Sequence, residues 1–178
     1  MSRMRRRSAG DSGAAAVEFA LVLPILVLIL FGIIDYGLFF SNTLSAESGV
    51  QTAARQAVVG NLDTACTPRP SGVSPNVGEL MCMVKHNTGS ITGTSFVKVM
   101  FPGDPSTAGW TPGQQLIVCE VIDVQGLTGY VPLPRHDGQV AIRSRVVTQI
   151  ETPPPGQQQP SDLGGEDGSP PGGWGWCT

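Results

Sequence analysis

The chain has 178 residues, of which 40% are hydrophobic and 14% are charged, and its formal net charge is −3. Residues 1–13 carry four arginines and one aspartate, whereas residues 14–178 carry seven basic and thirteen acidic residues. The acidic body excludes a nucleic-acid-binding protein, which needs a basic face. The low charge excludes a coiled-coil rod, and the 23 glycines follow no period of three, which excludes collagen.

The first predicted element is a membrane span. Residues 19–34 (FALVLPILVLILFGII) hold no charge, and residues 14–40 form the whole apolar stretch with Glu18 and Asp35 near its opposite edges. A span needs about 20 apolar residues. The basic residues before it, which the positive-inside rule places in the cytoplasm, are Arg3, Arg5, Arg6 and Arg7. We therefore predict a single-pass protein of the cell (inner) membrane, with residues 1–13 as a cytoplasmic leader and the rest of the chain extracytoplasmic.

A secretory signal peptide that is removed after export is the alternative. Its apolar core would measure only about 7–15 residues, which is shorter than this run. The best cleavage candidate, Leu44-Ser45-Ala46, has a bulky residue where a small one is needed. A retained anchor is the favoured interpretation.

The residues around the start of the span resemble a known family. Residues 13–24 read GAAAVEFALVLP, and residues 31–37 read FGIIDYG. Together with the basic leader they resemble the TadE-like family, the minor pilin-like proteins of the tight-adherence (Tad, Flp-type) pilus machinery. The resemblance covers about residues 5–60 and includes the pattern of class III prepilin signals. It implies membrane lipid, other pilin-like subunits and Tad assembly proteins as partners.

The same resemblance assigns roles to four residues. Gly13 would precede the cut made by a prepilin peptidase, and Ala14 would be the new N-terminus. Glu18 would be the fifth mature residue, followed by the aromatic Phe19. Whether this chain is cut, or stays an uncut anchor, is open at this point.

Each carboxylate at the edges of the span has two interpretations. Glu18 could pair with the α-amine of a neighbouring subunit, because a buried carboxylate needs a positive partner. It could also be an acidic residue at a helix N-terminus, favoured by the helix dipole. Asp35 could lie at the outer membrane interface or make a polar contact between packed helices, and the first is favoured.

We expect the first helix to continue beyond the span to residue 59, because residues 41–59 contain no proline and carry a modest amphipathic pattern. Gly60-Asn61 is a plausible stop. Residues 64–76 contain three prolines and a glycine and are predicted as a loop. Residues 78–86 suit a short second helix.

Three strands are predicted from alternating apolar residues, over residues 95–101, 115–124 and 140–150. In the second strand Glu120 shares a face with the apolar side chains Leu116, Val118, Ile122 and Val124. The expected fold is α+β, with a long transmembrane helix that extends into a small pilin-like external domain of residues 41–150, built from a short second helix and a three-stranded antiparallel sheet.

Residues 151–178 form a tail with six prolines and seven glycines and no core pattern, which predicts disorder. The tail ends in Trp174-Gly175-Trp176-Cys177. Two tryptophans and a cysteine on an exposed end would be a liability, so we expect the tip to fold back onto the domain.

The four cysteines, Cys66, Cys82, Cys119 and Cys177, lie outside the cytoplasm in this topology, where disulfides form. Four cysteines allow three pairings. The favoured pairing joins Cys66 to Cys82, which fixes the loop to the short helix, and Cys119 to Cys177, which ties the tail to the second strand.

No catalytic, cofactor or metal site is expected. Cys82 and His86 lie four residues apart on the short helix and His136 stands alone, and neither matches zinc-ligand spacing. The chain has no nucleophile elbow and no phosphate-binding glycine loop. The expected function is that of a structural component of a Tad-type (type IV-related) pilus or secretion apparatus. The alternative is a membrane-anchored extracytoplasmic binding module or adhesin that uses the sheet or the two tryptophans.

Overall fold

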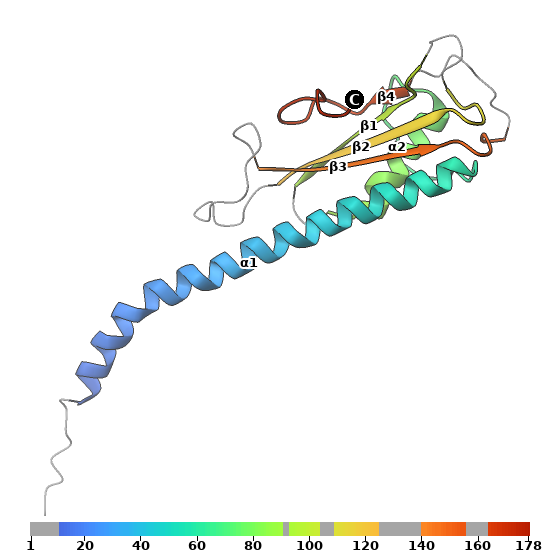
Figure 1. Cartoon of the computed structure of the whole chain (residues 1–178). Coiled ribbons are helices and arrows are strands. Elements are labelled where there is room, and N and C mark those ends of the chain that lie inside the picture. Colours follow the sequence, from blue (N-terminus) through green and yellow to red (C-terminus); the bar gives the residue numbers. More distant parts are fainter. Residues whose placement is uncertain (1–10, 91–92, 104–108, 125–139, 156–163) are drawn as a thin grey trace, which may run out of the picture.

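The structure is a computed structural model, and it describes residues 11–90, 93–103, 109–124, 140–155 and 164–178. The elements in chain order are α1 (Asp11–Val58), α2 (Pro75–Thr88), β1 (Thr94–Met100), β2 (Gln115–Asp123), β3 (Ala141–Gln149) and β4 (Gly164–Glu166). α1 carries the folded domain on its C-terminal half (Figure 1). The four leader arginines and His136 lie outside the described residues.

α1 is one continuous helix of 48 residues, as the sequence predicts. It ends at Val58, one residue before the predicted end at residue 59. Gly60 adopts a positive φ of 72°, and the amide of Asn61 donates to the carbonyl of Gln56 at 2.9 Å. Pro24 lies inside the helix and removes one backbone donor. In Figure 1 the N-terminal part of α1 curves away from the axis of the remainder.

α2 is longer at both ends than the predicted residues 78–86. It begins at Pro75, because the Ser74 hydroxyl accepts a hydrogen bond from the amide of Val77 at 3.3 Å and proline is tolerated at the first helical position. It ends at Gly89, whose left-handed conformation lets its amide donate to the Lys85 carbonyl. The prediction that the loop extends to residue 76 is therefore wrong by two residues.

The sheet is antiparallel with the strand order β3-β2-β1-β4. The three predicted strands match β1, β2 and β3 to within one residue at each end. The fourth strand, β4, comes from the tail and was not predicted, because two of its three residues are glycines. These glycines permit close packing. A Cβ on Gly164 would lie 2.2 Å from the Val99 carbonyl oxygen, and one on Gly165 would lie 2.4 Å from the Val73 side chain.

The domain has three layers. The two helices cover one face of the sheet, where α1 packs on β3 and β2 and α2 packs on β1 (Figure 1). The main core contains apolar side chains from both helices and the sheet, including Val50, Ala53, Leu80, Val97, Leu116 and Ile150. The C-terminal tail covers the opposite face, where Cys177 packs with Ile117 and Cys119, and Trp174 and Trp176 lie against this cluster. The α+β class is confirmed, and this end of the tail is folded rather than disordered.

Candidate functional site: the exposed face of the long helix

The N-terminal half of α1 is an apolar rod, and no other part of the described chain packs around it. The helix is long and apolar enough to cross a membrane, and its most apolar stretch is fully exposed in the structure. Large apolar side chains point outward all along this half, among them Val17, Phe19, Leu21, Ile25, Leu28, Ile29 and Ile33. A soluble monomer does not leave an apolar surface of this size bare. An apolar surface of this size suits a membrane or other apolar helices.

The predicted processing residues lie at the beginning of this rod. Gly13 and Ala14 belong to the first turns of α1, and both are exposed. A Cβ placed on Gly13 would meet no atom within 4 Å. No other described part of the chain therefore packs against Gly13.

Glu18 and Phe19 lie one turn further along the helix, and both side chains are exposed. Within the described part of the chain, Glu18 has no hydrogen bond or ion pair, and its helical neighbours are apolar. A carboxylate in such a position lacks the compensation that a low-dielectric environment requires. The geometry leaves Glu18 available to a group from outside this chain.

The domain meets α1 earlier than expected. Asp35 is only 3% exposed and Asn42 is fully buried, whereas the apolar residues just before Asp35 are exposed. Phe39 packs on a cluster that contains Ile122 and Ile142. The folded domain of the same chain therefore buries Asp35.

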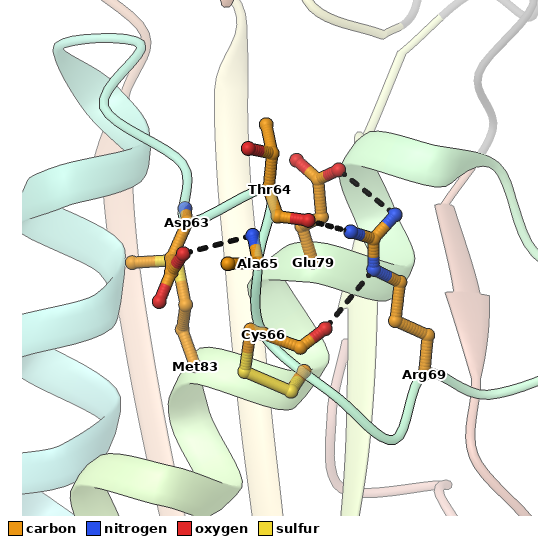
Figure 2. Close-up of a disulfide and its surroundings, with 8 residues drawn as sticks. Asp63, Thr64, Ala65, Cys66, Arg69, Glu79 and Met83 are labelled. Carbon is orange, nitrogen blue, oxygen red and sulfur yellow. Dashed lines mark hydrogen bonds and ion pairs between the residues drawn. A yellow bond between two sulfur atoms is a disulfide. The ribbon is translucent and has the colours of Figure 1, made fainter.

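The first cysteine pair fixes the loop between the two helices (Figure 2). Cys66 and Cys82 form a disulfide with their Cα atoms 6.0 Å apart. The Arg69 guanidinium holds the same loop, because it donates to the carbonyls of Thr64 and Cys66 and pairs with the buried Glu79 carboxylate at 3.0 Å. The loop is therefore cross-linked to α2 by one covalent bond and one ion pair.

The second cysteine pair fixes the tail to the sheet. Cys119 and Cys177 are both fully buried and form a disulfide with a Cα separation of 6.1 Å. These two pairs are those of the favoured connectivity. The tryptophans beside Cys177 are engaged with the domain: Lys98 lies 5.9 Å from the Trp174 ring centroid. Arg143 lies 5.5 Å from that of Trp176.

A buried carboxylate lies where α2 meets the sheet. Glu120 is fully buried, and it accepts hydrogen bonds from Thr88 Oγ1 at 2.8 Å and Ser95 Oγ at 2.6 Å. Burial raises the pKa of Glu120 to about 7, although both hydroxyls and the positive charge of Lys85 act in the opposite direction. Gly49 of α1 packs directly on Thr88, where a Cβ would lie 2.3 Å from Oγ1. The sequence placed Glu120 on the inward face but indicated neither hydroxyl partner.

The described residues contain no group of three or more His, Cys, Asp or Glu side chains that could hold a metal ion. Cys82 is bonded to Cys66, so it cannot act as a ligand with His86. A polar cleft of about 580 Å³ between the end of α1 and α2 is lined by Gln56, Asp63, Thr64 and His86 among others.

These features define a class: an α+β domain, cross-linked by two disulfides, carried on one long apolar helix that could anchor it in a membrane. A comparison with known protein families then bears on the long helix. Residues 13–55 match the model of the TadE-like protein family, which confirms the resemblance predicted from the sequence for this segment. This family suggests a component associated with the Tad pilus. No curated protein and no solved structure matches the chain.

Proposed function

We propose that this protein is a pseudopilin-like structural component of a Tad-type pilus or secretion apparatus, anchored in the inner membrane by the lower half of α1. The observation that carries the proposal is the exposed apolar half of α1, which falls inside the TadE-like segment. The arginine-rich leader stays in the cytoplasm, and the disulfide-linked domain lies outside, where oxidation is possible. The function is assembly, and it needs no cofactor.

Glu18 is the residue that we assign to subunit pairing. After a cut between Gly13 and Ala14 by a prepilin peptidase, the α-amine of Ala14 carries a positive charge in an apolar environment. Glu18 lies four residues along the helix and has no partner within the described part of the chain. Pairing between Glu18 of one subunit and the amine of the next compensates both charges and sets the axial register of the helices.

The assembly role is tested by replacing Glu18 with alanine or glutamine in the host cell. We expect Glu18→Ala and Glu18→Gln to insert into the membrane normally but to fail in assembly, because neither side chain carries the required charge. Membrane fractionation and recovery of the apparatus from the cell surface measure the two properties separately. Glu47→Gln is the matched control, since Glu47 is an exposed carboxylate on the upper half of the same helix. Normal assembly of the Glu18 variants would remove the role assigned to this residue.

The adhesin alternative receives less support. Trp174 and Trp176 are half-buried and their rings are engaged by Lys98 and Arg143 of the sheet. The indole of Trp174 also donates to the Gly168 carbonyl at 3.0 Å. These contacts favour a role for the tryptophans in closing the domain rather than in binding a ligand.

A further inference from the structure

The two disulfides differ in how completely the fold covers them. Cys119 and Cys177 are both fully buried, and the two tryptophans of the tail pack against them. Cys66 and Cys82 retain 8% and 4% exposure. Exchange with an external thiolate requires access to one of the two bonded sulfur atoms. The Cys66–Cys82 bond is therefore the more accessible of the two to thiol–disulfide exchange.

A cleft reaches each end of the Cys66–Cys82 bond. Cys66 lines the polar cleft of about 580 Å³ between the end of α1 and α2. Cys82 lines a second cleft of about 440 Å³, which it shares with the polar side chains of Arg69, Lys85 and His86. A thiol can approach the bond through the first cleft, and the thiolate that leaves is released into polar surroundings. Such surroundings favour a thiolate, whereas burial among apolar side chains disfavours it.

The bond opens by exchange with a dithiol. One thiolate of the dithiol attacks Cys66 Sγ, and the electron pair of the broken S–S bond goes to Cys82 Sγ. The second sulfur of the dithiol then attacks its partner in the mixed disulfide and releases the Cys66 thiolate. The dithiol gives up two protons and two electrons and becomes a disulfide, while Cys66 and Cys82 become two thiols.

Reduction leaves weaker contacts that still seat the loop on α2. Figure 2 shows Arg69 between the two: its Nε donates to the Cys66 carbonyl at 3.1 Å, and its guanidinium pairs with the Glu79 carboxylate. The Arg69 side chain is one-third exposed, and a partly exposed ion pair holds less firmly than a covalent bond. Residues 61–74 can then open and close locally.

We propose that the Cys66–Cys82 bond is a redox-sensitive latch on residues 61–74, which a dithiol opens reversibly while the Cys119–Cys177 bond stays closed. The loop forms one wall of the polar cleft, so opening the latch changes the shape of the cleft beside α1. The proposal concerns regulation of the domain rather than assembly. It depends on the proposed topology only for the compartment in which the dithiol acts.

The test compares the two bonds within one molecule. Purified full-length protein in detergent is incubated with dithiothreitol and alkylated at intervals with N-ethylmaleimide, and peptide mass spectrometry measures the free thiol at each cysteine. We expect Cys66 and Cys82 to be alkylated together, at least about tenfold faster than Cys119 and Cys177. In denaturant the two rates should become similar, because the fold causes the difference.

Release of the loop is measured by hydrogen exchange on the selectively reduced protein. Backbone amides in residues 61–67 should exchange faster than in the oxidised protein, whereas those of β2 should not change. Equal reduction rates of the two bonds in the native protein, or earlier reduction of Cys119–Cys177, would overturn the proposal. So would loop amides that exchange equally in both forms, or an increase that spreads over the whole domain.

Reversible closing is tested with a matched pair of variants. Arg69→Gln removes the contacts that seat the reduced loop, so the Cys66–Cys82 bond should re-form more slowly when oxidised glutathione replaces dithiothreitol. Arg55→Gln removes an equal charge from an exposed position on α1 and should re-form the bond at the wild-type rate. A wild-type rate in Arg69→Gln, or a latch that does not re-form in the wild type, would contradict reversible closing.

Discussion

At the scale of single residues, Glu120 is a polar group that the core must accommodate. Its carboxylate lies between α2 and the sheet, with Thr88 and Ser95 as hydrogen-bond donors. Gly49 allows α1 to approach Thr88 closely, so three elements depend on this one site. A buried polar network of this kind is stabilising only while each of its groups has a partner.

Glu120 makes the stability of the domain depend on pH. Its pKa is raised from 4.5 to about 7 in the folded protein, so the folded state binds the proton more tightly than the unfolded state. The stabilisation by the protonated form is complete below pH 4.5 and is lost as the pH rises through 7. The difference between the two limits is on the order of 3 kcal/mol.

We therefore expect Glu120→Gln to flatten this dependence. The amide keeps the shape of the side chain and can hydrogen-bond both hydroxyls, but it does not titrate. Thermal unfolding of both full-length proteins in detergent between pH 4.5 and 8 measures the effect. The wild type should lose stability relative to the variant as the pH rises. Equal pH slopes would show that Glu120 is not the titrating group.

At the scale of elements, the two disulfides have different tasks. The Cys66–Cys82 bond closes 16 residues and holds a loop to α2, whereas the Cys119–Cys177 bond closes 58 residues and holds the tail across the sheet. In the chain-entropy model these loops contribute about 3 and about 4 kcal/mol, respectively. The Cys119–Cys177 bond, which closes the longer loop, therefore contributes more to the stability of the domain.

We predict that the double variant Cys119→Ser, Cys177→Ser loses more stability than the double variant Cys66→Ser, Cys82→Ser. In the first variant the tail should also become sensitive to protease, because β4 pairs with β1 over only three residues. Denaturant unfolding and limited proteolysis measure the two effects. A larger loss from the 66/82 pair, or a tail that resists protease without Cys119–Cys177, would contradict this assignment.

The sequence predicted those elements whose signal is local. The apolar run and the alternating strands specify α1, β1, β2 and β3 because burial on one face leaves a periodic pattern. β4 leaves no such pattern, since its glycines are required by contact with Val99 and Val73 from elsewhere in the chain. The start of α2 differs from the prediction for another reason: the prolines indicate a loop that includes Pro75, whereas Ser74 caps a helix that begins there.

The residues of the candidate site also differ in whether a local sequence pattern could predict them. Glu18 and the residues around Gly13 belong to a contiguous motif, so sequence alone could single them out. The burial of Asp35 and the exposure of Phe40 depend on where the domain folds back against α1, which no local pattern records. Trp110, which is fully buried edge-on against Phe101 at 5.2 Å, likewise gave no signal in its glycine-rich surroundings.

At the scale of the whole molecule, α1 is about 70 Å long; its N-terminal half is apolar enough to cross a membrane, and its C-terminal half carries the folded domain. In the proposed topology, the basic leader sets the orientation of this helix. Removal of residues 1–13 takes away four arginines and one aspartate, and the side-chain charge changes from −3 to −6.

We predict that the protein extracted from host membranes begins at Ala14. Intact mass and N-terminal sequencing check this directly, and both methods should return the full chain from cells that lack the prepilin peptidase. Gly13→Leu should block the cut, because a bulky side chain replaces the small residue before the bond, while Gly32→Ala on the same helix should not. Protein that starts at Met1 in wild-type cells would remove the processing claim and leave the anchor unaffected.

The Cys119–Cys177 bond also links the completion of the fold to oxidation. Before the tail lies across the sheet, β1 lacks its β4 neighbour and the face that carries Ile117 and Cys119 is bare. An oxidant must therefore close this bond, across 58 residues of chain, before the tail is held covalently over that face.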